Sequence, residues 1–141
     1  MAPKFRTRDV EKSLYINYFK RAEECLHAAK NSLDNQEWNA TTISAIHSCI
    51  AVCDAMCVYF LGKRHAGENH NDAVALFKTI KYGEEINTNA NRIARVLRIK
   101  NMAEYEERLI FKSEAKKVLK DCERFRDYVK KQLPIPNQEG F

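Results

Sequence analysis

The sequence predicts an all-α protein built as an antiparallel bundle of four to five helices. Apolar residues recur at spacings of three and four along several stretches, and no stretch alternates as a strand does. The 141 residues hold four glycines and three prolines, which fits long helices joined by short links. This length suits one domain, residues 1–141, with a helical core at about 8–132 and loose tails at 1–7 and 133–141.

The first helix is expected from about Arg8 to Asn31. Its apolar stripe repeats at helical spacing, and charged residues occupy the other side. The stripe consists of Val10, Leu14, Tyr18, Ala22, Cys25, Ala29 and Leu33. Residues 34–37 then form a short polar turn.

The stretch from Trp38 to Gly62 is apolar on every side when read as a helix, so we expect it at the centre, buried by its neighbours. Gly62 is a suitable residue to end it. His47 and Asp54 lie seven positions apart, hence on nearly the same face and about 10 Å apart along the axis. We expect them to be polar residues buried in the core or at an interface with a second subunit.

The second half of the chain predicts three more helices. Their inner faces again follow helical spacing, and glycines and prolines separate them. The predicted segments are a polar loop at 62–69, a helix from near His70, a loop at 81–87, a helix at 88–101, an irregular turn at 102–112, and a helix from Ser113 that ends before Pro134.

The charge and composition of the chain indicate which partners and which cellular location to expect. A formal net charge of +5 is compatible with nucleic acid or another anionic partner. The basic start of the chain does not read as a signal peptide, and the polar residues of the central stretch argue against a membrane span. We therefore expect a cytoplasmic protein.

Three of the five cysteines, Cys49, Cys53 and Cys57, recur every four residues on the central helix. Such a stripe could supply thiolates to a metal. The paired spacing and neighbouring histidine of a zinc site are missing, so the pattern favours small core residues in a reducing compartment. We predict neither a metal nor a cofactor.

Two blocks of sequence resemble the HEPN family, named for higher eukaryotes and prokaryotes nucleotide-binding. The first block consists of Ala45-Ile46-His47-Ser48, Asp54-Ala55, Leu61-Gly62-Lys63-Arg64 and Gly67-Glu68-Asn69-His70, followed by Ala73 and Leu76. The second consists of Lys100-Asn101-Met102-Ala103-Glu104-Tyr105-Glu106 and then Ser113-Glu114-Ala115. The resemblance covers about residues 10 to 132.

The resemblance implies a helical bundle, often a homodimer, that works on RNA. In the family that the chain resembles, the active members are metal-independent ribonucleases. In them an arginine holds the scissile phosphate and a histidine acts in acid–base catalysis. Relatives also pair with nucleotidyltransferase-type proteins.

At the position of that motif this sequence has Lys100, Asn101 and Tyr105. Lysine keeps the positive charge but loses the planar fork of arginine, and tyrosine is a poor general base at neutral pH. The resemblance therefore implies a degenerate catalytic site that can still bind phosphate. The structural alternative is that Asn101 ends its helix and Tyr105 packs under the following turn.

A second candidate site lies in the loop from Arg64 to His70. There the N-terminus of the third helix would favour an anion; the alternative is a solvated loop with His70 packed against or capping that helix. Arg92 and Arg95 are further candidates for phosphate binding, although acidic residues nearby on the last helix could pair with them instead.

The first functional hypothesis is a domain that binds RNA or a nucleotide as a homodimer, with weak or no nuclease activity. One alternative is an active metal-independent endoribonuclease, a toxin or defence effector, using Lys100, Asn101 and Tyr105, or Arg64 and His70. The other is a protein-interaction module that pairs with a nucleotidyltransferase-type partner.

Overall fold

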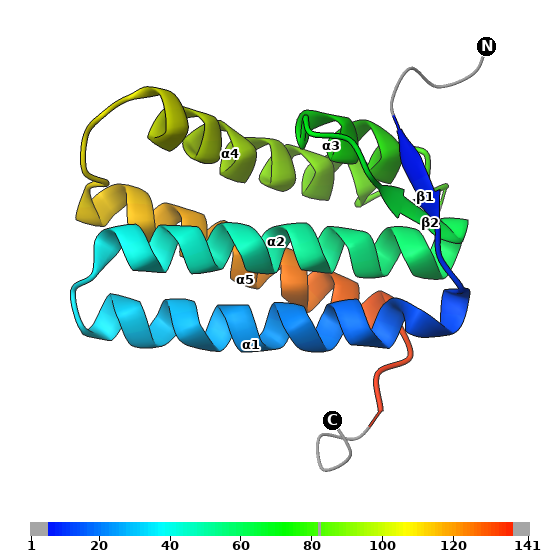
Figure 1. The fold of residues 1–141 in the computed structure, drawn as a ribbon. Coiled ribbons are helices and arrows are strands. Elements are labelled where there is room, and N and C mark those ends of the chain that lie inside the picture. Colours follow the sequence, from blue (N-terminus) through cyan, green and yellow to red (C-terminus); the bar gives the residue numbers. More distant parts are fainter. Residues whose placement is uncertain (1–5, 82, 137–141) are drawn as a thin grey trace.

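The computed structural model describes residues 6–81 and 83–136, and within them five α-helices pack together. This confirms the predicted helical bundle (Figure 1). The elements are β1 (Thr7–Asp9), a 3-10 turn (Lys12–Leu14), α1 (Tyr15–Asp34), α2 (Trp38–Leu61), β2 (Lys63–His65), α3 (Asn71–Lys78), α4 (Ile86–Tyr105) and α5 (Lys112–Gln132).

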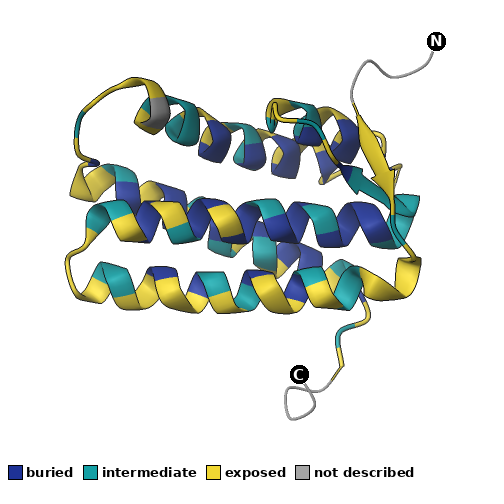
Figure 2. Cartoon of the chain, in the orientation of Figure 1, coloured by how far each residue is buried: buried dark blue, intermediate teal, exposed yellow. Residues whose placement is uncertain are grey.

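Helix α2 is the centre of the bundle, as its composition predicts. It contacts α1, α3, α4, α5 and β2. Figure 1 shows α1 lying antiparallel along it, with α5 crossing behind and α3 and α4 along the opposite side from α1. Helix α2 is long and apolar enough to cross a membrane, but 61% of its most apolar window is buried inside the bundle, so it is a core helix (Figure 2).

Small residues let the helices approach α2 closely. The Ser48 hydroxyl donates to the carbonyl oxygen of Ala22 on α1 at 2.8 Å, and the Cys122 thiol donates to that of Ala45 at 3.1 Å. Both bonds satisfy polar atoms inside an apolar interface, where an unpaired atom would be costly.

The cysteine stripe belongs to this core. Cys49, Cys53 and Cys57 are each about 1% exposed and lie in one apolar cluster with Met56 and Cys122. Their burial confirms that they are small core residues.

Two short antiparallel strands were not predicted. Strand β1 pairs with β2 so that Thr7 lies opposite His65 and Asp9 opposite Lys63. The predicted loose arm at 1–7 is therefore wrong for Thr7, which lies in β1, and the first helix does not start at Arg8. The predicted loop at 62–69 is wrong for residues 63–65, which form β2. Strands of three residues are too short to show alternation, and this pairing joins segments that are distant in sequence. Residues 1–5 of the expected arm lie outside the described residues.

The boundaries of α1 and α4 also differ from the predicted ones, and α4 begins at Ile86, two residues earlier than expected. Helix α1 begins at Tyr15 and continues to Asp34, because the preceding residues are taken up by the strand and the 3-10 turn. Helix α4 continues to Tyr105, so the expected irregular turn at 102–112 is wrong for its first four residues. Met102 and Ala103 favour helix, and neither glycine nor proline interrupts them. Gly62 ends α2 with a φ of 69°, as predicted.

Candidate functional site

One side of α2 is not covered by the bundle. The stripe Ile43, His47, Ile50 and Asp54 follows helical spacing and is exposed or half-buried, with Ile43 59% exposed. The expectation that neighbours bury α2 all round is therefore wrong on this side. His47 is exposed, so its predicted burial is also wrong, because no helix packs over this stripe. A role for His47 at an interface stays a prediction.

His47, Ile50 and Asp54 of the open stripe line a hollow of about 250 Å³, which we call the cationic hollow. Four parts of the chain contribute side chains to it. Its lining consists of Arg21 from α1, Ile46, His47, Ile50, Ala51 and Asp54 from α2, His70 from the start of α3, and Lys100 from α4. Two cations, two imidazoles and one carboxyl group thus meet over the centre of the fold.

Asp54 is the acidic group of the cationic hollow. Burial raises its pKa to about 7 because it disfavours the charged form, although the positive charges of Arg64 and Arg21 act in the opposite direction. Arg64 lies on β2 and donates to the carbonyl oxygen of His65 at 2.9 Å. Near neutral pH this carboxyl group therefore changes charge easily.

His70 occupies the N-cap position of α3 without a side-chain capping hydrogen bond. Its ring lies 5.8 Å from the ring of His65, centre to centre. His65 is buried, and that burial lowers its pKa. His65 therefore packs beside His70 as a buried residue in which the neutral imidazole is favoured.

The two candidate sites predicted from separate stretches of sequence meet in space. A second hollow of about 440 Å³ holds His70 together with Lys100, Asn101 and Tyr105, and also Glu68, Asn69 and Asn71. His70 and Lys100 line this hollow as well as the cationic hollow. The structural alternative for the motif is wrong, because Asn101 lies within α4 and Tyr105 is 84% exposed.

Arg92 and Arg95 lie apart from this convergence. The Arg95 guanidinium donates to both carboxylate oxygens of Asp121 at 3.2 and 3.0 Å, which raises the pKa of Arg95. Arg92 donates to the side chain of Asn89 at 2.8 Å. Arg92 lines a different hollow, between α4 and α5, together with Glu85, Thr88, Asn89, Arg124, Asp127, Tyr128 and Lys131. Phosphate binding by either arginine stays a prediction.

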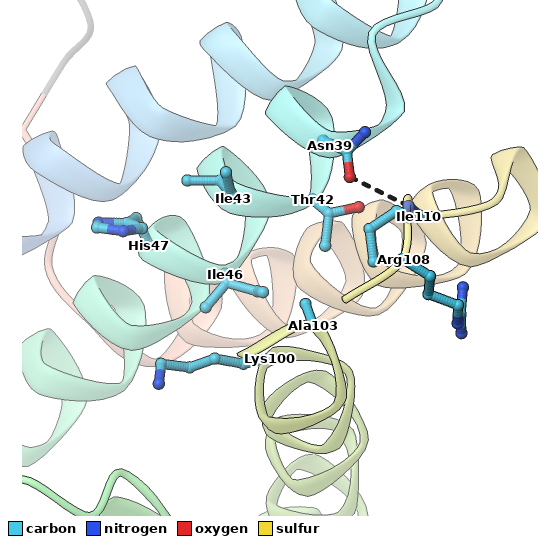
Figure 3. A pocket seen from close by; sticks show the side chains of 9 residues that line it. All are labelled: Asn39, Thr42, Ile43, Ile46, His47, Lys100, Ala103, Arg108 and Ile110. Atoms are coloured by element: carbon cyan, nitrogen blue, oxygen red, sulfur yellow. Dashed lines mark hydrogen bonds between the residues drawn. The ribbon is translucent and has the colours of Figure 1, made fainter. Parts of the chain in front are cut away.

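An apolar hollow of about 300 Å³ adjoins the cationic hollow (Figure 3). It lies between the first half of α2, the end of α4 and the segment before α5. Its lining consists of Asn39, Thr42, Ile43, Ile46, His47, Lys100, Ala103, Arg108 and Ile110. The two hollows share Ile46, His47 and Lys100, so they form one continuous depression.

Comparison with known protein families matches residues 16–132 to the HEPN domain. The match covers most of the chain. The chain belongs to the HEPN family. HEPN domains are RNA-binding and ribonuclease domains, which agrees with the resemblance seen in the two sequence blocks. A search of curated proteins found no match to the chain.

Sequence reasoning missed two residues at the site of this HEPN domain. Arg21 reads as one of several charges on the outer side of α1, and Asn39 as an ordinary residue of the first turn of α2. No local pattern distinguishes them, because their place at the site depends on how α1 and α4 lie against α2. Across residues 6–81 and 83–136, no three His, Cys, Asp or Glu side chains gather as metal ligands would.

Proposed function

We propose that this HEPN domain binds RNA or a nucleotide by a phosphate group in the cationic hollow. The observation that carries the proposal is the convergence of Arg21, His70 and Lys100 from three helices on one depression. Phosphate groups attract the charges of Arg21 and Lys100, the imidazole of His70 can donate a hydrogen bond to a phosphate oxygen, and lysine is a frequent phosphate ligand. The net charge of +5 also favours an anionic ligand.

We also propose that the domain cleaves RNA weakly or not at all. At the motif position, Lys100 supplies a point charge where a planar fork would hold two phosphate oxygens. Tyr105 is 84% exposed, and tyrosine is a poor proton acceptor at neutral pH. The motif is therefore degenerate: it keeps an attraction for phosphate and loses the group that would move a proton.

A homodimer in the cytoplasm is part of the same proposal. Large apolar side chains are exposed near the depression, with Ile43 59%, Leu109 75% and Phe111 60% exposed. Exposed apolar groups of this kind mark interaction sites. The same surface could serve a nucleotidyltransferase-type partner, and the two assemblies differ in mass.

One observation favours an active metal-independent endoribonuclease as the second candidate, in the role of a toxin or defence effector. His47 and His70 both line the hollow that holds Lys100. Imidazole is the commonest acid–base group in enzymes, and two histidines could serve attack by the RNA 2′-OH and departure of the leaving oxygen.

The first experiment measures binding of a labelled single-stranded RNA as a function of salt for the wild type, Lys100→Ala and Lys116→Ala. Lys116 is an exposed lysine of α5 outside the depression and serves as the matched control. We expect Lys100→Ala to lower affinity at least tenfold and to reduce the salt slope by about 0.7, the value for one phosphate contact. Equal losses in the two variants would mean that binding is diffuse and not centred on the hollow.

A parallel assay incubates the RNA with the protein in EDTA. We expect the wild type to leave the RNA intact while binding it. Cleavage that His47→Ala or His70→Ala abolishes would replace the binding proposal by the ribonuclease. Light scattering of the same samples gives the mass and so tests the homodimer.

A further inference from the structure

We propose that the apolar hollow holds the base of the nucleotide whose phosphate lies against Lys100. This inference rests on the proposed function, because it takes the phosphate in the cationic hollow as its starting point. It adds a second subsite with a different chemistry, formed mainly by α2, α4 and the segment before α5.

The apolar hollow adjoins the cationic hollow. Lys100, His47 and Ile46 belong to the linings of both hollows. Figure 3 shows the side chains of Lys100 and His47 at one end of the apolar hollow and that of Arg108 at the other. A ligand with a phosphate against Lys100 can therefore extend directly over the apolar surface, as a nucleotide's sugar and base require.

The walls of the apolar hollow are suited to the face of a base. Ile43, Ile46 and Ile110 supply apolar surface, and Ala103 leaves space beside them. Ile43 remains 59% exposed, although an isoleucine gains free energy when a ligand covers it. A base has two apolar faces that pack on such side chains. The volume of about 300 Å³ lies at the lower end of the range for small-ligand pockets, about 300 to 1,000 Å³.

A polar side chain, Asn39, lies at the edge of this apolar surface. The Asn39 side-chain oxygen accepts a hydrogen bond from the Ile110 backbone N–H at 3.1 Å, which fixes the orientation of the amide. Its NH₂ group has no partner in the part of the chain that the structure describes. Thr42 is 1% exposed, and its hydroxyl donates to the carbonyl oxygen of Trp38 at 2.9 Å, so it closes the hollow without offering a polar group to a ligand. A base edge that carries an acceptor matches the Asn39 NH₂ group.

The experiment compares ribose 5-phosphate with the 5′-monophosphates of adenosine, guanosine, cytidine and uridine by calorimetry. The variants are Ala103→Leu, which fills the hollow and keeps every cation, and Asn39→Asp, which keeps the acceptor for Ile110 and removes the donor. Ala28→Leu on the exposed side of α1 is the matched control. All variants are first checked for an unchanged thermal unfolding midpoint.

We expect at least one nucleotide to bind about tenfold more tightly than ribose 5-phosphate, a difference of about 1.4 kcal/mol. Ala103→Leu should remove that difference and leave ribose 5-phosphate binding unchanged. Asn39→Asp should change the ranking of the four nucleotides. Ala28→Leu should have no effect on any ligand.

Three results would overturn the inference. If ribose 5-phosphate binds the wild type as tightly as every nucleotide and Lys100→Ala weakens all of them, the base subsite is refuted while phosphate binding stands. If no ligand binds the wild type, the phosphate site falls as well. If Ala103→Leu turns a dimer into a monomer and leaves nucleotide affinity unchanged, a second copy of the chain covers the hollow instead of a base.

Discussion

The two sides of α2 both carry large apolar residues but have opposite environments. On the closed side Val52, Met56 and Cys53 are at most 1% exposed, packed inside the bundle. On the open side Ile43 is 59% exposed, and His47 and Asp54 line a hollow. The helix places its only histidine and its only carboxylate on the side that its neighbours leave open. The difference shows that apolarity locates the core helix but does not identify its functional side.

The closed side should dominate stability. Met56→Ala should lower the free energy of unfolding by about 2 to 5 kcal/mol, because it removes a fully buried side chain and leaves a cavity. Ile43→Ala on the open side should lower it by less than about 0.5 kcal/mol. Urea denaturation of both variants measures the two values. Similar losses would show that the open side is covered in the folded protein in solution.

Asp54, on the open side, should make the stability of the protein depend on pH, which the apolar residues of the closed side cannot do. Its pKa is about 7 in the folded protein and near the ordinary value of 3.8 when unfolded, so the folded state binds more protons between these values. The contribution of Asp54 to stability therefore falls as pH rises from about 4 to about 7. Asp54→Asn should stabilise the protein at pH 8 by more than about 1 kcal/mol relative to the wild type, and by little at pH 4.

Urea denaturation at the two pH values measures this effect, and using the wild type as reference cancels the titration of other groups. His65 works in the other direction, since its lowered pKa makes stability fall as pH drops below the value of a free histidine. If the difference in free energy of unfolding between the wild type and Asp54→Asn is the same at pH 4 and pH 8, the raised pKa of Asp54 is refuted.

Ser48→Ala should have an intermediate effect. It removes the 2.8 Å hydrogen bond to the Ala22 carbonyl oxygen, a buried bond between α1 and α2 that adds to the helical hydrogen bonding of α1, which should cost about 0.5 to 1.5 kcal/mol. Thermal unfolding measures the loss, with Ser44→Ala, a half-buried serine of the same helix, as the matched control. An unchanged midpoint for Ser48→Ala would mean that water replaces the lost donor.

His47→Ala should have the smallest effect on stability, within about 0.5 kcal/mol, because the side chain is exposed. Its effect should appear instead in RNA binding, where loss of the imidazole from the lining removes a contact with the ligand. We therefore expect His47→Ala to weaken RNA binding while leaving the free energy of unfolding nearly unchanged. A large loss of stability without loss of binding would assign His47 to an interface.

The periodicity of the sequence sufficed for the helical bundle, because each helix hides a stripe of apolar residues at helical spacing. It could not give the β1–β2 pairing, where three residues on each side carry no periodic signal. It also did not extend α4 to Tyr105, because the apolar spacing of the helix stops before Asn101, and only the helix propensity of Met102 and Ala103 indicates that the helix continues.

The candidate site was predictable in its parts but not in its assembly. Lys100 and His70 were singled out from different stretches, and only the packing of α3 and α4 on α2 brings them to one depression. The contribution of Arg21 depends on the position of α1 across that depression. The burial predicted for His47 failed because a helix that is apolar all round does not indicate which side its neighbours leave open.

The pairing of Thr7 with His65 has a practical meaning for handling the protein. The ring of His65 lies 5.8 Å from that of His70, which lines the cationic hollow, so strand β1 is connected to the candidate site through β2. A bulky fusion placed directly before Arg6, or deletion of 6–9, should therefore disturb ligand binding although it lies far from Lys100 in sequence. Affinity handles and fluorophores are better attached after Pro136, where α5 has already ended.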